Sequence, residues 1–407
     1  MKFTKMSLVA ALLIGSSAFA IENTKVSGDA KVYYSTNDAG TNSDLFKKDT
    51  SAAQAAFGLG ITTDLVTGVS AGMHMTALST LGLEGQLVNN VWEATNGVSD
   101  SWWVDEAWLA ATLGKTTVKV GRMELDTPLV FSEQWSIAAN TFEAAVIINQ
   151  DVPDTTLVGA YVGGSNGTHN TGAGAVAGGG IAGVIAGFNA NGTTNFSQFH
   201  RGAYAAAAIN NSWKPLTVQA WYFQASHVLK GAAWLQADLA MEGITAGVQY
   251  TTMDLSSLNP ALQDNTAIAG KLGYTMKDMF TASVAYSQVD DAAGAGAGFN
   301  LSGGGAAQSK LYTEAWWNYS YVTKPDTQAI NVTVESPVNG MFDLGVYYTD
   351  VNQGAKGGNR DLTELTLTAS KSVGPLDATL AYINTDATDQ NAGSSFNTVQ
   401  AYLTLNF

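Results

Sequence analysis

The sequence predicts a single transmembrane antiparallel β-barrel, with eighteen strands as the preferred count and sixteen as the alternative. Three observations carry this prediction. Segments of about ten residues with alternating apolar and polar side chains recur from Val26 to the end of the chain. The chain begins with a secretory leader. It ends with Phe407, an aromatic residue that closes one more alternating segment.

The leader is expected to be residues 1–20. Lys2 and Lys5 give it a positive start, the apolar core runs from residue 6 to 15, and Ala18-Phe19-Ala20 is a small-x-small cleavage site. The apolar core is too short to span a bilayer. The mature protein should therefore begin near Ile21, and residues 21–407 should form one barrel domain in a Gram-negative outer membrane.

Composition fits a barrel better than a soluble protein. Charged residues make up 13% of the 407 residues, about half the usual share of ~25%. No stretch reaches the ~18 uninterrupted apolar residues that a membrane helix needs. The absence of cysteine excludes disulfides and thiol-bound metal. Low charge without long apolar runs is typical of strands that face lipid on one side only.

The net charge of −15 argues against a nucleic-acid partner and favours cations near the mouths of a pore. An alternative is that acidic surface loops only aid solubility and bridge divalent ions on a lipopolysaccharide surface. Outer-membrane lipid and lipopolysaccharide are in either case the expected surroundings.

The clearest strands place β-branched and aromatic residues at every second position, with small polar residues between them. Such sets fall on one face of a strand because successive side chains point to opposite sides. The best examples are Ile244-Ala246-Val248-Tyr250, Phe280-Ala282-Val284-Tyr286, Ile330-Val332-Val334 and Phe342-Leu344-Val346-Tyr348.

Tight turns and longer loops alternate between the strands, as periplasmic turns and external loops do in outer-membrane barrels. Strict alternation with both termini in the periplasm gives eighteen strands, provided that Leu311–Tyr321 belongs to the seventh external loop or to an upward extension of its strands. The expected tight turns are Val66–Gly68, Gly114, Asp151–Asp154, Ser212–Pro215, Met241–Gly243, Lys277–Asp278, Ser336–Gly340 and Gly374–Pro375.

The last strand is apolar at Val399, Ala401, Leu403, Leu405 and Phe407, with polar residues between them. It has the pattern of a closing barrel strand, with one apolar face toward lipid and one polar face toward water. Its terminal aromatic residue resembles the signal by which the bacterial barrel-assembly machinery recognises its clients. Phe407 is therefore the expected assembly signal.

Residues 121–163 resemble outer-membrane porins of the OprD-like and epsilonproteobacterial type. The resemblance is carried by Gly121-Arg122 at a strand end, Thr127-Pro128-Leu129 in the following loop, Thr141-Phe142 at the next strand and the hairpin return Asp154–Leu157. It implies an eighteen-stranded barrel whose third external loop, here Glu124–Asn140, folds into the lumen and narrows it.

The chain departs from that family in its arginines. Members that admit carboxylates typically line the pore with a ladder of arginines, whereas this chain has only Arg122, Arg201 and Arg360. Glu143 stands where a basic residue could follow the Phe of the sixth strand. Three arginines cannot form such a ladder, so the resemblance does not extend to a carboxylate-specific pore.

For a channel, selectivity comes from charged side chains that face one another across a narrow waist. The third loop contributes acids, and alternation assigns further charged residues to the lumen: Glu106, Lys115, Lys119, Glu143, Asp238, Lys271, Glu335, Asp343 and Glu364. The expected constriction residues are Glu124, Asp126 and Glu133 on the loop, Lys115 and Lys119 on the strand before it, and Glu106, Glu143 and Arg122 on the wall.

Arg122 is the exception to simple alternation. It shares its parity with Val118 and Val120, which face lipid. Either a bulge at Gly121 turns the side chain inward or it lies at the level of the lipid headgroups. The inward turn is preferred here, because the residue adjoins the constriction loop.

These features predict an outer-membrane porin, a water-filled channel for passive diffusion of small hydrophilic solutes and ions, with a preference for cations. The alternatives are a substrate-specific channel of the same fold and a mainly structural or adhesive barrel. No enzyme is expected, because the four histidines are widely separated and no catalytic motif is present. No cofactor or metal is expected, and a homotrimer is one expected assembly.

Overall fold

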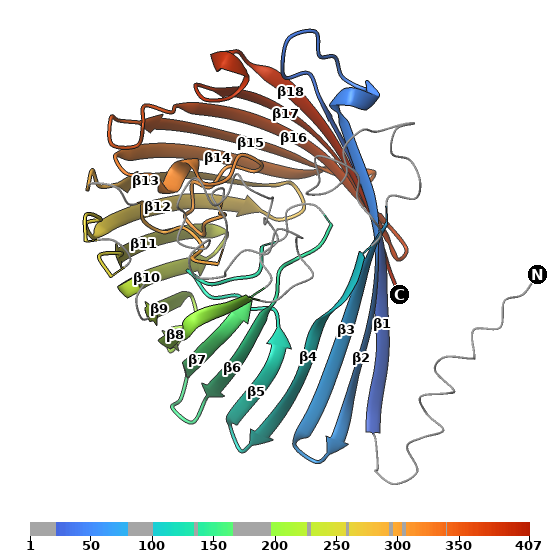
Figure 1. Cartoon of the computed structure of the whole chain (residues 1–407), viewed down its shortest axis with the longest axis vertical. Helices are drawn as coiled ribbons and strands as arrows, with labels where there is room; N and C mark the ends of the chain where they lie inside the picture. Colours follow the sequence, from blue (N-terminus) through green and yellow to red (C-terminus); the bar gives the residue numbers. More distant parts are fainter. Residues whose placement is uncertain are drawn as a thin grey trace, which may run out of the picture.

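A computed structural model describes residues 22–79, 101–133, 137–165, 197–225, 229–257, 260–292, 296–302, 307–338 and 340–407. Within them, eighteen antiparallel strands follow one another around a single sheet (Figure 1). The strands are β1 Glu22–Asn37, β2 Ser51–Val66, β3 Val69–Ser79, β4 Ser101–Leu113, β5 Thr116–Met123, β6 Phe142–Asn149, β7 Thr155–Ser165, β8 Ser197–Asn210, β9 Leu216–Ala225, β10 Leu229–Met241, β11 Ile244–Asp254, β12 Asn265–Met276, β13 Phe280–Val289, β14 Thr327–Val338, β15 Phe342–Gln353, β16 Leu362–Val373, β17 Leu376–Ala387 and β18 Phe396–Asn406.

The sheet closes on itself because β1 pairs with both β2 and β18. The closing register runs from Asp29 opposite Asn406 to Asn37 opposite Thr398. The count of eighteen is confirmed, and sixteen is excluded. Each predicted tight turn joins two consecutive strands. Within Ser336–Gly340, the first three residues still belong to the last pairs of β14, and Pro337 is tolerated there because a missing N–H at the strand end costs little.

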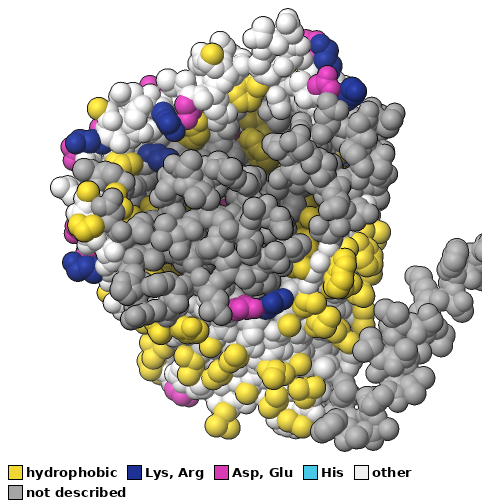
Figure 2. All heavy atoms as spheres, viewed as in Figure 1, with side chains coloured by type: hydrophobic (Ala, Val, Ile, Leu, Met, Phe, Trp, Pro, Cys, Tyr) yellow, Lys and Arg dark blue, Asp and Glu magenta, His cyan; other side chains and the backbone are white. Residues whose placement is uncertain are grey.

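The two faces of the wall differ as alternation predicts. Outward side chains such as Val248 and Leu272 are 61% and 58% exposed, whereas inward Trp234 and Met253 are fully buried. Figure 2 shows hydrophobic side chains gathered over the lower part of the visible wall. An exposed apolar band suits a hydrocarbon solvent, because no water-facing protein of this size would leave it uncovered.

Two loops lie inside the ring of strands, and they create the buried core (Figure 1). Loop L3 is residues 124–141 and loop L7 is residues 290–326. Leu129 and Val130 of L3 and Leu311 of L7 pack against inward-facing wall residues such as Phe223. The predicted inward folding of the third loop is confirmed, and residues 311–321 form no strand. The sequence did not predict that L7 also enters the lumen.

The remaining regular elements are short 3-10 helices at Lys48–Thr50, Tyr321–Thr323 and Asn391–Gly393. In the part of the chain that the structure describes, no helix is long and apolar enough to cross a membrane. The expected leader, residues 1–20, lies outside the described residues.

Candidate functional site

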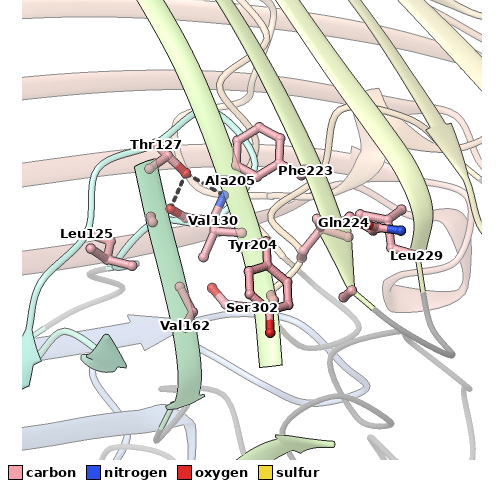
Figure 3. A pocket seen from close by; sticks show the side chains of 14 residues that line it. Leu125, Thr127, Val130, Val162, Tyr204, Ala205, Phe223, Gln224, Leu229 and Ser302 are labelled. Atoms are coloured by element: carbon pink, nitrogen blue, oxygen red, sulfur yellow. Dashed lines mark hydrogen bonds between the residues drawn. The ribbon is translucent and has the colours of Figure 1, made fainter. Parts of the chain in front are cut away.

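Loop L3 is held against the wall by a buried apolar tip. Thr127 and Val130 close a small turn, in which the Thr127 hydroxyl donates to the Val130 carbonyl at 2.6 Å and accepts from the Val130 N–H at 3.1 Å (Figure 3). The turn directs Leu129 and Val130 into the contact between L3 and the wall, and both are almost fully buried. A small apolar cavity of about 20 Å³ remains between L3 and the wall near Phe223 and Leu229 (Figure 3).

Glu133 joins L3 to L7. Its carboxylate is 1% exposed and accepts hydrogen bonds from the Asn300 side chain at 2.8 Å and the Gln308 N–H at 2.9 Å. The Asn300 amide also donates to the Phe131 carbonyl at 2.8 Å. Glu133 was expected to face the pore, whereas the structure places it in the contact between the two loops.

L7 is in turn fixed to the wall on its far side. The Tyr312 hydroxyl donates to Asp238 of β10 at 2.6 Å, and the Lys271 ammonium lies 4.4 Å from the centre of the Tyr312 ring. Glu364 of β16 accepts the backbone N–H groups of Trp317 and Asn318 at 3.0 and 2.7 Å. The two loops therefore form one plug that spans from L3 to β16.

Carboxylates gather on the inner face of β1 to β5, where Ile137 and Ala138 of L3 also pack against Tyr33 and Trp103. This acidic wall consists of Asp29, Asp105, Glu106 and Glu124. Asp105 accepts from His74 at 2.8 Å and from Thr76 at 2.8 Å, and Glu106 accepts from the Trp108 indole at 3.2 Å. In the described part of the chain two lysines face the cluster: Lys31, 3.2 Å from Asp29, and Lys119, which lies 4.2 Å from the centre of the Trp108 ring.

The position of Asp105 depends on a bulge. Strict alternation would point Glu106 inward and Asp105 toward lipid. The register instead shifts between His74 and Met75, which pair with Glu106 and Val104, so Asp105 is the extra residue and also faces the lumen. The adjacent acids Asp105 and Glu106 are the sequence feature that indicates this bulge, because a carboxylate facing hydrocarbon is unfavourable.

Glu124 begins L3 and completes the acidic wall. Partial desolvation, followed by repulsion from Glu106 and Asp105, raises the pKa of this carboxyl above its ordinary value. Lys31 and His74 oppose that rise. Such mutual repulsion between carboxylates is relieved when a mobile cation enters among them.

The structure brings together Glu106, Lys119 and Glu124 of the expected constriction residues. Asp126 is largely exposed and forms an ion pair with Lys310 of L7, whose ammonium lies 5.0 Å from the centre of the Phe131 ring. Lys115 is exposed in the tight turn between β4 and β5, at the opposite end of β5 from L3. It therefore lies away from the loop that it was expected to face.

Arg122 and Glu143 pair with each other, at 3.0 Å between Nε and Oε1, and Arg122 also donates to the Val104 carbonyl at 3.0 Å. Their strand neighbours Met123 and Phe142 are buried under L3. Alternation then puts the Arg122–Glu143 pair on the outward face, so the expected inward turn of Arg122 is not found, nor is the lumenal placement of Glu143.

A row of exposed tyrosines shows at which level of the wall Arg122 lies. Six strands that rise toward the long loops carry an exposed tyrosine as their seventh residue, a belt typical of the membrane interface. Arg122 holds the same seventh position on β5 and therefore lies at the headgroup level. The tyrosines are Tyr161, Tyr222, Tyr250, Tyr286, Tyr348 and Tyr382.

Several lumen residues were absent from the expected constriction. Asp29 and Asp105 belong to the acidic wall and Lys31 pairs with Asp29. Lys310 and Glu314 belong to L7, whose inward path is not marked by any sequence periodicity. Alternation did place Asp238, Lys271 and Glu364 on the inner face, and the structure confirms this. Within the described ranges, no group of three or more acidic or histidine side chains could hold a metal ion.

Glu314 of L7 makes the docking of this loop sensitive to pH. Both of its carboxyl oxygens are buried and form no hydrogen bond of ordinary geometry within the described residues, although Ser309 and the Ala315 N–H lie close enough to oppose a rise in its pKa. Burial, reinforced by Glu133, raises the pKa of Glu314 from 4.5 to about 8. Glu133 of L3 and Tyr319 of L7 are titratable groups close to it, and Tyr319 is also close to Glu364 of β16.

We expect the docking of L7 to weaken as the pH rises from about 4.5 to about 8. Below that range Glu314 is protonated in both the docked and the released loop, and above it Glu314 is ionised in both. Between the limits only the released loop loses the proton, so each step upward in pH favours release. Hydrogen exchange of L7 amides, corrected for intrinsic rates, measures the change.

Glu314→Gln is the matched variant, because its side chain stays neutral at every pH. Its L7 protection should be constant between pH 5 and pH 8.5, apart from any contribution of Glu133 and Glu364. An unchanged pH profile in this variant would assign the effect to those two carboxylates and would contradict the prediction for Glu314.

Comparisons with known proteins agree on one kind of protein. A family model described as Gram-negative porin matches residues 7–309. The fold resembles the crystal structure of Pseudomonas aeruginosa OpdK with vanillate, with a TM-score of 0.72 and 13% identity over 96% of this chain and 99% of that one. No curated protein matches the sequence.

Two further solved structures give the same picture. Pseudomonas aeruginosa OccK8 (OprE) has a TM-score of 0.71 and 14% identity, and the match covers 96% of this chain and 99% of that chain. A BenF-like porin from Pseudomonas fluorescens has a TM-score of 0.71 and 12% identity, with coverage of 95% and 100%. At these identities the likeness concerns the fold.

Proposed function

Because the chain belongs to the Gram-negative porin family and forms an outer-membrane channel, we propose that it passes small hydrophilic solutes and ions with a preference for cations. A porin of this family is not an enzyme. The proposal for cations rests on one observation, the acidic wall. Among the described residues, its four carboxylates, Asp29, Asp105, Glu106 and Glu124, are accompanied by two lysines and by His74.

The acidic wall faces the lumen, where its electric field can distinguish cations from anions. L3 and L7 occupy part of the lumen with apolar side chains such as Leu129 and Leu311, so a hydrated ion is directed toward the carboxylates. Low-dielectric walls focus the field of such a charge cluster. Cations should concentrate there, and anions should be repelled.

We expect the variant Asp105→Asn/Glu106→Gln/Glu124→Gln to lose most of this preference. The ratio of cation to anion permeability should fall by about fivefold, since a carboxylate a few ångströms from a cation contributes roughly 1 kcal/mol in water. Reversal potentials in planar bilayers under a salt gradient measure the ratio.

The control removes the same number of charges far from the lumen waist. Asp151→Asn/Glu242→Gln/Asp278→Asn changes three exposed acids in tight turns and should leave the ratio unchanged. An equal loss in both variants would assign selectivity to net charge rather than to the acidic wall. A wild-type protein that conducts no current would favour the structural or adhesive barrel instead.

A substrate-specific channel is the second candidate, and the comparisons support it more directly. L3 and L7 contact each other inside the lumen through Glu133 and Asn300 and so narrow it together. The OpdK structure that resembles this fold contains vanillate. Solute flux distinguishes the two candidates, because a specific channel saturates with concentration while a diffusion pore gives a linear response.

The other expected partners remain part of this proposal. They are outer-membrane lipid and lipopolysaccharide around the apolar band, the assembly machinery at Phe407, and a homotrimer as the assembled state. No nucleic acid is included among them, since the net charge is −15.

A further inference from the structure

Loop L1, residues 38–50, bends outward over the rim of the barrel, whereas L3 and L7 bend into the lumen. Thr36 of β1 has the parity of the outward-facing Val32 and pairs with Ser51 of β2, yet Thr36 and Ser51 are almost fully buried. L1 covers them, and the Thr36 hydroxyl accepts the Phe46 N–H at 2.8 Å. The backbone of L1 at Phe46 therefore lies on the lipid side of the wall.

This contact lies directly above the tyrosine belt. Along β11, β13, β15 and β17 the belt tyrosine lies two residues lower in the register at each step. Tyr382 of β17 is level with Thr36 across β18, so the next step leads to Tyr34 on β1. The Tyr34 hydroxyl lies 3.0 Å from the hydroxyl of Ser51, which L1 covers. L1 therefore extends the belt at the level of the lipid headgroups.

Phe46 is held in a conformation that leaves its side chain uncovered. Its φ is +66°, in the left-handed region that bulky residues rarely adopt, and the residue is 67% exposed. The hydrogen bond to the buried Thr36 hydroxyl fixes this geometry. An exposed ring on a strained backbone is unfavourable in water, but aromatic rings are favoured where a membrane meets water. Phe46 is therefore suited to insertion among lipid headgroups.

Charged side chains of both signs surround this ring at the tip of L1, residues 44–49. Lys47 and Lys48 are exposed, and Lys47 forms an ion pair with Asp44. Figure 2 shows basic and acidic side chains together at the upper right of the view, where Figure 1 draws L1 in blue. Asp44 and Asp49 balance the two lysines. A phosphate would therefore be bound by the nearest ammonium groups and not by a net charge of the loop.

We propose that L1 anchors the rim of the barrel to the outer leaflet of the outer membrane. The Phe46 ring lies among the lipid headgroups, and Lys47 and Lys48 contact lipopolysaccharide phosphates, which lysine binds as a point charge. The partner is lipid because L1 continues the tyrosine belt, a surface that lipid already covers. The proposal depends on the outer-membrane location and on neither the cation preference nor the solute.

The absence of cysteine allows a single spin label to report the depth of L1. Phe46→Cys carries the nitroxide in the full chain, reconstituted in nanodiscs that contain lipopolysaccharide. Leu272→Cys marks the lipid face, and Ala355→Cys marks an exposed position in the external loop of residues 354–361. The label at position 46 should collide more often with oxygen than with a water-soluble nickel complex, as at position 272, and the reverse should hold at position 355.

Two outcomes of this measurement would overturn the proposal. Collision rates at position 46 that match those at position 355 would place L1 in water. Dipolar broadening between labels at position 46 of neighbouring copies would assign L1 to a contact between subunits.

The phosphate contact is tested by surface plasmon resonance with detergent-dispersed lipopolysaccharide and the immobilised full chain. Lys47→Gln/Lys48→Gln should weaken binding by about twentyfold, because each lysine near an anionic surface contributes about fivefold. Lys214→Gln/Lys277→Gln is the matched control: it removes two exposed lysines from tight turns at the opposite end of the barrel, and Lys214, like Lys47, is ion-paired. Heat-modifiable migration on gels checks that each variant is folded.

The control variant should bind like the wild type. No binding by the wild type, an equal loss in both variants, or equally tight binding of dephosphorylated lipopolysaccharide would overturn the phosphate contact.

Discussion

Glu364→Ala should release L7 from the barrel wall and increase single-channel conductance. Glu364 is 1% exposed, and its carboxylate accepts the N–H groups of Trp317 and Asn318 and also the Asn318 side-chain amide at 2.7 Å. Alanine would remove this acceptor from the two backbone N–H groups, while the Asn318 amide would keep its bond to Thr385 at 3.0 Å. We expect a loss of about 3–5 kcal/mol of docking free energy, typical for removing one member of a buried charged network.

The control for this variant is Glu335→Ala. Glu335 lies on the inner face of neighbouring β14, but it is exposed and accepts one hydrogen bond, from Tyr347 at 2.6 Å. Its removal should leave conductance close to that of the wild type. Protease cleavage within L7 supplies a second measurement. Unchanged conductance together with unchanged protection in Glu364→Ala would show that L7 is held by its apolar contacts alone.

Removing Phe407 should reduce the amount of assembled barrel more than any single change in the wall. Its backbone forms two hydrogen bonds with Gly28 of β1, at 2.8 and 2.9 Å, and its ring stacks on Phe57 with centres 5.9 Å apart. Gly28 permits this approach, because a side chain there would lie 2.6 Å from the ring. Deletion removes the last bonds of the closing seam.

Two variants separate closure from recognition by the assembly machinery. Phe407→Ser keeps the backbone bonds but loses the ring contact, which contributes about 1–2 kcal/mol. Both variants should leave most of the protein unassembled in cells, as measured by heat-modifiable protein in outer-membrane fractions. If purified Phe407→Ser refolds into detergent normally but fails to assemble in cells, the ring acts as a signal. Normal assembly of both variants would contradict the prediction.

The wall could be predicted from the sequence because alternation and turn chemistry repeat along it. The tight turns and the closing strand before Phe407 follow from a period of two residues and from prolines and glycines at strand ends. The same reasoning placed Asp238 and Glu364 on the inner face. It failed at Asp105, where a single bulge moves one side chain across the wall.

The inward path of L7 could not be read from the sequence, because it depends on individual contacts between distant residues. Glu133 meets Asn300, and Tyr312 meets Asp238, across separations that no local pattern records. Arg122 shows the opposite case. Like Tyr222 and Tyr348, Arg122 is the seventh residue of its strand, so its level in the membrane is encoded in the sequence. The correspondence becomes apparent only when the strands are aligned from their first residues.

The contact between Glu133 and Asn300 has a consequence for how the pore can open. Each loop supplies the hydrogen-bond partner that the other needs, with the Leu301 N–H also donating to the Leu129 carbonyl at 2.8 Å. Neither loop can swing away without leaving buried groups of the other unsatisfied. Both loops should therefore move together when the pore opens. Recordings should show a single large current step rather than two smaller, independent steps.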